Sequence, residues 1–214
     1  MILTRHEIQR LIAEKQLIFT PKLDPWQNQP HAVDLRLGTT FYVPKIWKMS
    51  ENGREIITVD VTQANEHYER LELRPGQYFE LAPGESIIAS SLERVEMHAK
   101  NLMGVLYPRS SVNRKGLSVD LTGIIDAHYA GNLMIPLSNR TQSQIIRILP
   151  GERICQVVFE TLSSPLSRQE ALQHGAATAK YAESTKNELI SKPDSQKELD
   201  FLRKGDFLGL KGEE

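Results

Sequence analysis

The side chains best suited to chemistry lie within residues 107–139, which read YPRSSVNRKGLSVDLTGIIDAHYAGNLMIPLSN. Arg109 stands beside Ser110 and Ser111, and an arginine fork with neighbouring hydroxyls is well suited to binding phosphate oxygens. Asp126 directly follows two isoleucines that hold a turn to the core, and a carboxylate fixed at the edge of a cavity can accept a proton from water. Together the two groups indicate acid–base hydrolysis of a nucleoside triphosphate.

Each of these groups also has a structural interpretation. Arg109 and the serines would serve equally as a surface arginine beside a helix cap, and Asp126 would accept hydrogen bonds from the amides of its own turn. Tyr129 presents a flat ring that suits packing against a sugar. His128 is interpreted as a solvated turn residue, because no second His, Cys or carboxylate stands at ligand spacing.

Four further residues are candidates on weaker local grounds. Gln156 follows a Pro-Gly turn and adds a donor to the same site if its strand lies beside it; otherwise it is an outward residue of a core strand. Asp34 either organises a metal site through water or caps a turn. Lys180 and Tyr181 come late in the chain, where a lysine either closes over phosphates or is simply solvated.

Composition bounds the class of protein. The chain has 214 residues, of which 40% are hydrophobic and 25% charged, with a formal net charge of −1, so we expect one globular domain and no nucleic-acid partner. No apolar run approaches the roughly 20 residues of a membrane span, so no membrane partner is expected, and the early charges of MILTRHEIQR do not suit a signal peptide. A single cysteine, Cys155, excludes an internal disulfide, is interpreted as a core residue and fits a cytoplasmic protein.

The elements that position these residues are mainly strands. Thr4 and Glu7 form a capping box that predicts an N-terminal helix ending near Lys15. Pro-Gly pairs and short apolar segments then predict a mainly β fold, a distorted antiparallel barrel or sandwich. The predicted strands are LIFTP, VDLRLG, TTFYVP, IITVDV, QYFELAPG, SIIASS, LMGVLYP, LMIPLSN, IIRILPG and RICQVVFE.

A few short helices accompany the strands. Residues 110–116 predict a helix opened by Ser110 or Ser111, and SRQEALQHG predicts one closed by Gly175. Residues 183–214 are rich in charge and are interpreted as a tail, mobile or packed on a neighbour, with a helical turn or two in KELDFLRK. The domain is expected to span residues 1–182.

Four segments in one order resemble motifs one to four of the trimeric dUTPase and dCTP deaminase superfamily: HAVDLRLG, YPRSSVNRKG, GIIDAHYAG and PGERICQ. The resemblance spans roughly residues 1–182. The N-terminal helix, the R-L-G after motif one and ATAKY at residues 177–181 resemble the deaminase branch, whereas the third and fourth motifs have the dUTPase form. The resemblance implies the dUTPase-like β-clip fold and a homotrimer with sites between subunits.

The two branches differ in chemistry, and the third motif favours hydrolysis. In the deaminase branch a glutamate on the strand after motif three serves proton transfer, and this chain has Pro136 there, which has no ionisable group. The preceding hairpin is one residue shorter than in that branch and lacks its arginine. We therefore predict dUTP diphosphatase activity on a deaminase-like scaffold. The alternatives are a dCTP deaminase, including a bifunctional one that forms dUTP or dUMP from dCTP, and a non-catalytic nucleotide-binding relative.

The resemblance also assigns roles. Asp126 is the general base for a water that attacks the α-phosphorus of dUTP, and Mg²⁺ is held mainly by the triphosphate and water, with Asp34 contributing indirectly through water. Uracil is read by backbone groups of hairpin 120–125, where Asp120 is a further candidate for altering base preference. The expected substrate contacts are Arg109, Ser110, Ser111 and Gln156 at the phosphates, Thr122, Gly123 and Ile124 at the base, Tyr129 under deoxyribose, and Lys180 and Tyr181 in a closing segment. Arg109 and Asp126 are expected to come from different chains.

Overall fold

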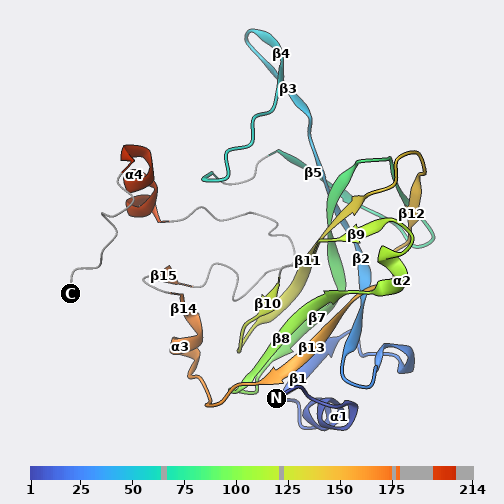
Figure 1. Ribbon diagram of the computed structural model, residues 1–214, viewed down its shortest axis with the longest axis vertical. Coiled ribbons are helices and arrows are strands. Elements are labelled where there is room, and N and C mark those ends of the chain that lie inside the picture. Colours follow the sequence, from blue (N-terminus) through green and yellow to red (C-terminus); the bar gives the residue numbers. More distant parts are fainter. Residues whose placement is uncertain (64–66, 121–122, 175–176, 179–194, 206–214) are drawn as a thin grey trace.

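The protein is built around one curled antiparallel sheet, seen in a computed structural model that describes residues 1–63, 67–120, 123–174, 177–178 and 195–205 (Figure 1). The strand order is β10-β8-β13-β2-β7-β11-β9, with β1 added on β7 and β5 on β2. The prediction of a mainly β, distorted antiparallel barrel or sandwich is confirmed. The strands of this sheet are β1 (Leu17–Thr20), β2 (Val33–Pro44), β5 (Tyr68–Glu72), β7 (Ser86–Met97), β8 (Leu102–Pro108), β9 (Leu117–Val119), β10 (Ile124–Ile125), β11 (Ala130–Asn139) and β13 (Arg153–Thr161).

Smaller elements surround the sheet. Three two-stranded pairs are formed by β3 (Trp47–Ser50) with β4 (Gly53–Ile56), β6 (Phe79–Leu81) with β12 (Ile146–Ile148), and β14 (Gln173–His174) with β15 (Ala177–Thr178). The helices are α1 (Arg5–Ala13), the 3₁₀ turn η1 (Pro25–Gln27), α2 (Ser110–Asn113), α3 (Arg168–Leu172) and α4 (Gln196–Lys204). Among the described residues, no helix is long and apolar enough to cross a membrane.

The N-terminal helix forms as the capping box predicts. The Thr4 amide donates to the Glu7 carboxylate over 2.8 Å, which satisfies a backbone donor that helix geometry leaves open. Lys15 takes a φ of 57°, a left-handed conformation that ends the helix where the sequence indicated. Just before the helix, the Leu3 amide donates to the Phe159 carbonyl over 2.9 Å, so the chain start is tied to β13.

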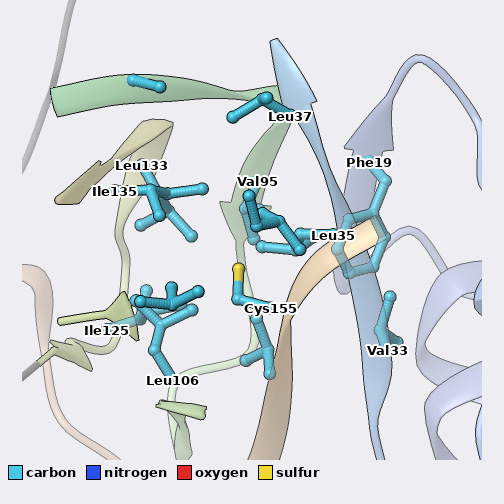
Figure 2. Packing of buried hydrophobic residues seen from close by; sticks show 14 of the residues in the cluster. Phe19, Val33, Leu35, Leu37, Val95, Leu106, Ile125, Leu133, Ile135 and Cys155 are labelled. Atoms are coloured by element: carbon cyan, nitrogen blue, oxygen red, sulfur yellow. The ribbon is translucent and has the colours of Figure 1, made fainter. Parts of the chain in front are cut away.

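The core lies on the inner face of the curled sheet. Along β11 the alternate residues Leu133, Ile135 and Leu137 are buried, as expected for a strand with one face on the core. Figure 2 shows Cys155 on β13 among aliphatic side chains that include Leu35, Val95 and Leu106. Burial raises the pKa of the Cys155 thiol to about 12, so it stays protonated and unreactive at neutral pH, as a core residue should.

Glycine geometry explains two features of the strand pattern. At each Pro-Gly turn the glycine has a positive φ, of 83° at Gly76, 76° at Gly84 and 92° at Gly151, so these predicted turns are confirmed. Within β2, Gly38 allows one strand to continue where two segments were predicted. The pairing register between β2 and β7 shifts between Leu37 and Phe41, which is the signature of a bulge.

Some predicted boundaries were wrong. The predicted strand IITVDV contributes only Ile56, at the end of β4, and residues 57–61 form no strand. Six strands were missed: β3, β5, β9, β10, β14 and β15. The hairpin of β3 and β4, for example, exposes apolar residues and shows no clear alternation. Arg109 caps α2, one residue earlier than predicted, and α3 ends at Leu172 instead of extending to Gly175.

In the tail, α4 confirms the predicted helical segment KELDFLRK. The rest of the tail, residues 183–194 and 206–214, lies outside the described residues. The division at residue 182 therefore stays a prediction.

Candidate active site

Strand β8 delivers Arg109 to the start of α2, where its side chain is held on two sides. The Arg109 Nε lies 3.2 Å from Oδ2 of Asp34, and its Nη1 donates to the Arg153 carbonyl over 2.9 Å. The side chain is still 25% exposed, so part of the guanidinium faces solvent. A planar cation fixed in this way is suited to receiving an anion with little loss of side-chain entropy.

Asp34 is the buried anchor of this cluster. Its Oδ2 also lies 3.2 Å from Nη1 of Arg153 and accepts a hydrogen bond from the Gln29 amide over 3.2 Å. Burial raises the pKa of the Asp34 carboxyl, and the neighbouring Arg109 and Arg153 guanidinium groups act in the opposite direction. The contacts of Asp34 are with arginines, and its predicted role at a metal through water stays a prediction.

The other phosphate candidates lie at the same edge of the sheet. Gln156 on β13 is the register partner of both Asp34 on β2 and Tyr107 on β8, so the three side chains share one face. That face is opposite the core, because the alternating neighbours of these residues are buried. Ser110 and Ser111 are exposed in the first turn of α2. The structure therefore brings together the predicted arginine, hydroxyl and glutamine donors.

The hairpin that carries the candidate carboxylate is anchored to the other end of β8. Ile125 is 2% exposed and pairs with Gly104, whereas Ile124 is 65% exposed. The Gly123 carbonyl accepts a hydrogen bond from the Leu106 amide over 3.0 Å. A Cβ added at Gly123 would lie 2.9 Å from Cδ1 of Leu106, so glycine permits this close approach. Thr122 lies outside the described residues.

Asp126 follows this anchor with a half-exposed side chain, 51% accessible. Its Oδ2 lies 3.4 Å from Nε2 of His174 on β14, while its backbone carbonyl accepts from the Tyr129 amide over 3.2 Å. The carboxylate thus points out of its own turn. The turn is completed by His128, whose φ is 64° and whose Nε2 lies 3.0 Å from the Leu166 carbonyl. His128 is therefore a half-buried turn residue and not the solvated one expected.

Two remaining candidates differ in what the structure describes. The Tyr129 hydroxyl donates to the Asn132 carbonyl over 3.0 Å, and its ring packs against the core cluster. Lys180 and Tyr181 lie outside the described residues, so their predicted closing role stays a prediction.

Arg109, with its neighbouring donors, and the Asp126 turn lie at opposite ends of β8. Gly104, the register partner of Ile125, precedes Arg109 by five residues along an extended chain. At about 3.3 Å per residue this places the turn roughly 17 Å from Arg109. Figure 1 accordingly shows α2 and β10 well apart. Within one chain, Arg109 and Asp126 therefore lie at separate places along β8.

A polar cluster that the sequence analysis did not assemble lies between β9 and β11. The Asp120 amide donates to the Pro136 carbonyl over 3.0 Å, and the Asp120 carboxylate accepts hydrogen bonds from the hydroxyls of Ser118 and Ser138. Arg140 lies 3.5 Å away from the same carboxylate. The hydrogen bond from Ser118 is the main cause that lowers the pKa of Asp120. The period-two spacing of Ser118 and Asp120 was the signal available in the sequence.

Comparison with known proteins defines the class. Residues 2–162 match the model of the dCTP deaminase-like family, and the chain therefore belongs to this family. Among its relatives, a protein named dCTP deaminase, dUMP-forming, from Dictyoglomus thermophilum is 35% identical over 167 residues, covering 77% of this chain and 82% of the relative. A protein of the same name from Methanopyrus kandleri is 32% identical over 178 residues, covering 81% and 89%.

A solved structure supports the fold. The 2'-deoxycytidine 5'-triphosphate deaminase from Agrobacterium tumefaciens matches 75% of this chain with a TM-score of 0.55 at 24% identity. The chain spans about half, 48%, of that protein's length. The prediction of the dUTPase and dCTP deaminase superfamily is confirmed.

These relatives overturn the main functional prediction. The chain was predicted to be a dUTP diphosphatase, and the relatives that cover most of it are named dCTP deaminases that form dUMP. The error has a physical reason: the prediction rested on residue types suited to phosphates and to a water, and such residues do not determine the chemistry at the base. The coarser prediction, an enzyme with a dUTPase-like fold, holds.

Proposed function

We propose that this protein converts dCTP to dUMP, removing the 4-amino group as ammonia and cleaving the triphosphate to release pyrophosphate. The observation that carries the proposal is the match to dUMP-forming deaminases over a region that includes both the Arg109 edge and the Asp126 turn. Formation of dUMP as the nucleotide product requires chemistry at the base and at the α-phosphorus. The hydrolase-like third motif fits the second of these steps.

The donors gathered around Arg109 position the triphosphate. Arg109, oriented by Asp34, supplies a planar pair of donors, and the Ser110 and Ser111 hydroxyls add further donors at the start of α2. Gln156 extends this row from β13. Because little covalent chemistry is required of these groups, their contribution is orientation and stabilisation of the charge that develops during cleavage.

Asp126 supplies the base for the hydrolytic step. Its half-exposed carboxylate accepts a proton from a water as that water's oxygen bonds to the α-phosphorus and the bond to the bridging oxygen breaks, with pyrophosphate leaving. Tyr129, fixed through its hydroxyl to the Asn132 carbonyl, offers a ring against the deoxyribose.

The active enzyme is proposed to be a homotrimer in which each site is shared. The separation of roughly 17 Å between Arg109 and the Asp126 turn along β8 supports this arrangement, because a neighbouring chain then supplies the missing half of each site.

A divalent cation such as Mg²⁺ fits this arrangement as part of the substrate complex. Among the residues that the structure describes, no group of three or more His, Cys, Asp and Glu side chains is placed to hold an ion, and Asp34 is engaged by arginines. This donor set suits an ion held mainly by triphosphate oxygens and water. When bound, the ion would neutralise negative charge on the phosphates.

An enzyme-coupled ammonia assay tests the base chemistry. The protein is incubated with dCTP, CTP or dUTP in the presence of Mg²⁺, and the nucleotides are then separated by ion-exchange chromatography. We expect ammonia and dUMP from dCTP and much slower turnover of CTP. An absence of ammonia from dCTP, with dUMP formed only from dUTP, would overturn the proposal.

A second candidate is a protein that binds the nucleotide without turning it over. Pro136 favours it, because this residue cannot transfer a proton from the strand position where the deaminase branch carries its glutamate. Titration calorimetry with dCTP separates the candidates: tight binding with no ammonia at any Mg²⁺ concentration would support the binding protein.

A further inference from the structure

We propose that Asp120 is the carboxylate that transfers protons in the deamination step, presented from the end of β9 because the neighbouring position on β11 is a proline. This inference rests on the proposed deaminase function and identifies the group that performs its first half. The carboxylate, its hydrogen-bonding hydroxyls and the proline form one cluster on the outer face of the sheet.

The chemistry of deamination requires such a group. A water oxygen bonds to C4 of the cytosine ring while one water proton is passed to ring N3. The remaining hydroxyl proton is then passed to the amino group, the C4–N bond breaks and ammonia leaves, so that a C4 carbonyl remains. Each transfer needs a group that accepts a proton and returns it, and an ionised carboxylate held near the ring does this well.

Strand register places Asp120 beside Pro136. Leu137 pairs with Val119 and Ser138 with Ser118, so Asp120 stands directly across from Pro136. Directly opposed residues of an antiparallel pair project to the same face, with Cβ atoms about 5 Å apart. A carboxylate at residue 120 therefore extends into the space that a side chain at residue 136 would occupy.

The missing amide of Pro136 fixes where the strand ends. The Asp120 amide donates to the Pro136 carbonyl, but Pro136 has no N–H to return to the Asp120 carbonyl. The ladder cannot continue with full pairing, and β9 ends at Val119. Asp120 thus stands at the root of the hairpin that leads to Gly123 and Asp126, which is the hairpin expected to meet the base.

Two hydroxyls hold the Asp120 carboxylate in one orientation, and a third contacts one of them. Ser118 donates to Oδ1, Ser138 donates to Oδ2 over 2.9 Å, and the Ser86 hydroxyl lies 2.9 Å from that of Ser138. The side chain is 37% exposed, so it remains accessible to a nucleotide and a water. Donors of this kind keep the carboxylate ionised, so that it can accept the first proton, and they lower its pKa, so that it returns that proton readily.

Other carboxylates near β11 are less suitable. Glu93 is fully buried and accepts hydrogen bonds from the backbone and side chain of Arg36. Glu96 pairs in register with Ala130, at the other end of β11 from Pro136. Asp126 is already assigned to the α-phosphorus. Among the described residues, Asp120 is the carboxylate that combines partial exposure with a place beside Pro136.

The decisive test removes the Asp120 carboxylate and then supplies a carboxylate from the neighbouring position on β11. Asp120→Asn should lower kcat for ammonia release from dCTP by at least about 100-fold while KM changes by only a few-fold, because shape and hydrogen bonding are nearly conserved and the proton acceptor is lost. Adding Pro136→Glu to this variant supplies a carboxylate from β11 and should recover at least about a tenth of the wild-type rate.

Matched controls separate a catalytic role of Asp120 from a structural role in holding β9 against β11. Ser138→Ala removes one of the same hydrogen bonds and keeps the carboxylate, so it should reduce kcat by less than about ten-fold. If Asp120→Asn and Ser138→Ala behave alike and Pro136→Glu rescues nothing, Asp120 is structural and the inference is wrong. If wild-type protein releases no ammonia from dCTP, the proposed function itself fails, which is a separate result.

Discussion

Burial and charge act in opposite directions at Asp34. The carboxyl is only 2% exposed, and burial raises its pKa even though Arg109 and Arg153 both contact it. A buried ion pair of this kind contributes little net stability, because removing the ions from water offsets their attraction. Its value is to orient Arg109, so we expect its removal to affect substrate binding more than folding.

Asp34→Asn tests this view. Since the native pKa is raised, the native state holds the proton more tightly, and stability due to this group is lost as pH rises from about 4 through the raised pKa. Relative to wild type, the variant should therefore become more stable as pH rises. At pH 7 it should lose less than about 1 kcal/mol, because the Arg109 and Arg153 side chains are 25% and 32% exposed and water can solvate them. Urea unfolding at several pH values measures this, and KM for dCTP should rise. A loss above about 3 kcal/mol would show that the two arginines are costly to leave without their carboxylate partner.

Asp126→Asn should divide the proposed reaction into its two halves. The amide cannot accept a proton from water, so cleavage at the α-phosphorus should fall by about 100-fold or more. Ammonia release should continue, because that step is assigned to Asp120. Chromatography of dCTP reactions should then show dUTP in place of dUMP. Equal loss of ammonia and dUMP would show that Asp126 and Asp120 do not serve separate steps.

The junction between β2 and β7 is a tight contact near the site. A Cβ at Gly38 would lie 2.9 Å from the carbonyl oxygens of both Ser90 and Ser91, and 2.5 Å from the Ser90 hydroxyl. Backbone atoms of paired strands cannot move away independently. Glycine at this bulge therefore keeps β2 continuous from Asp34, at the site, to the β5 pairing.

Gly38→Ala should destabilise the protein by about 1–3 kcal/mol, because overpacking forces the two strands apart. Thermal unfolding measures the loss. Ser90→Ala should have little effect alone and should not rescue Gly38→Ala, because the two carbonyls remain. Full rescue by Ser90→Ala would show that the steric clash is with the Ser90 hydroxyl.

Elements with strong local signals were predictable from the sequence. The capping box of Thr4 and Glu7 and the three Pro-Gly turns require only neighbouring residues, and each appears as expected. Strand β9 and the Asp120 cluster depend on pairing with β11, which the period-two spacing of Ser118 and Asp120 alone does not specify. The base chemistry was mispredicted because residues suited to phosphates and water do not determine what happens at the base.

At the scale of the whole molecule, the site is divided by the length of β8. The motifs identified Arg109 and Asp126 as candidates. Their separation of roughly 17 Å follows only from the register of β10 on β8. A shared site in an oligomer reconciles the motif with the geometry.

Subunit mixing tests the shared site. Arg109→Lys lacks the planar fork, and Asp126→Asn lacks the base, so each variant alone should form little dUMP. In a random equal mixture about three quarters of trimers contain both chains, and each has one complete site of three, so roughly a quarter of wild-type activity should return. Mixtures no more active than the separate variants would place both groups of each site in one chain.

The central claim is best tested by counting products from dCTP in the same quenched samples. Ammonia, nucleotides and pyrophosphate are measured over the first few turnovers of wild-type protein with Mg²⁺. We expect equal amounts of ammonia, dUMP and pyrophosphate. Intact dCTP after prolonged incubation with stoichiometric protein would contradict it.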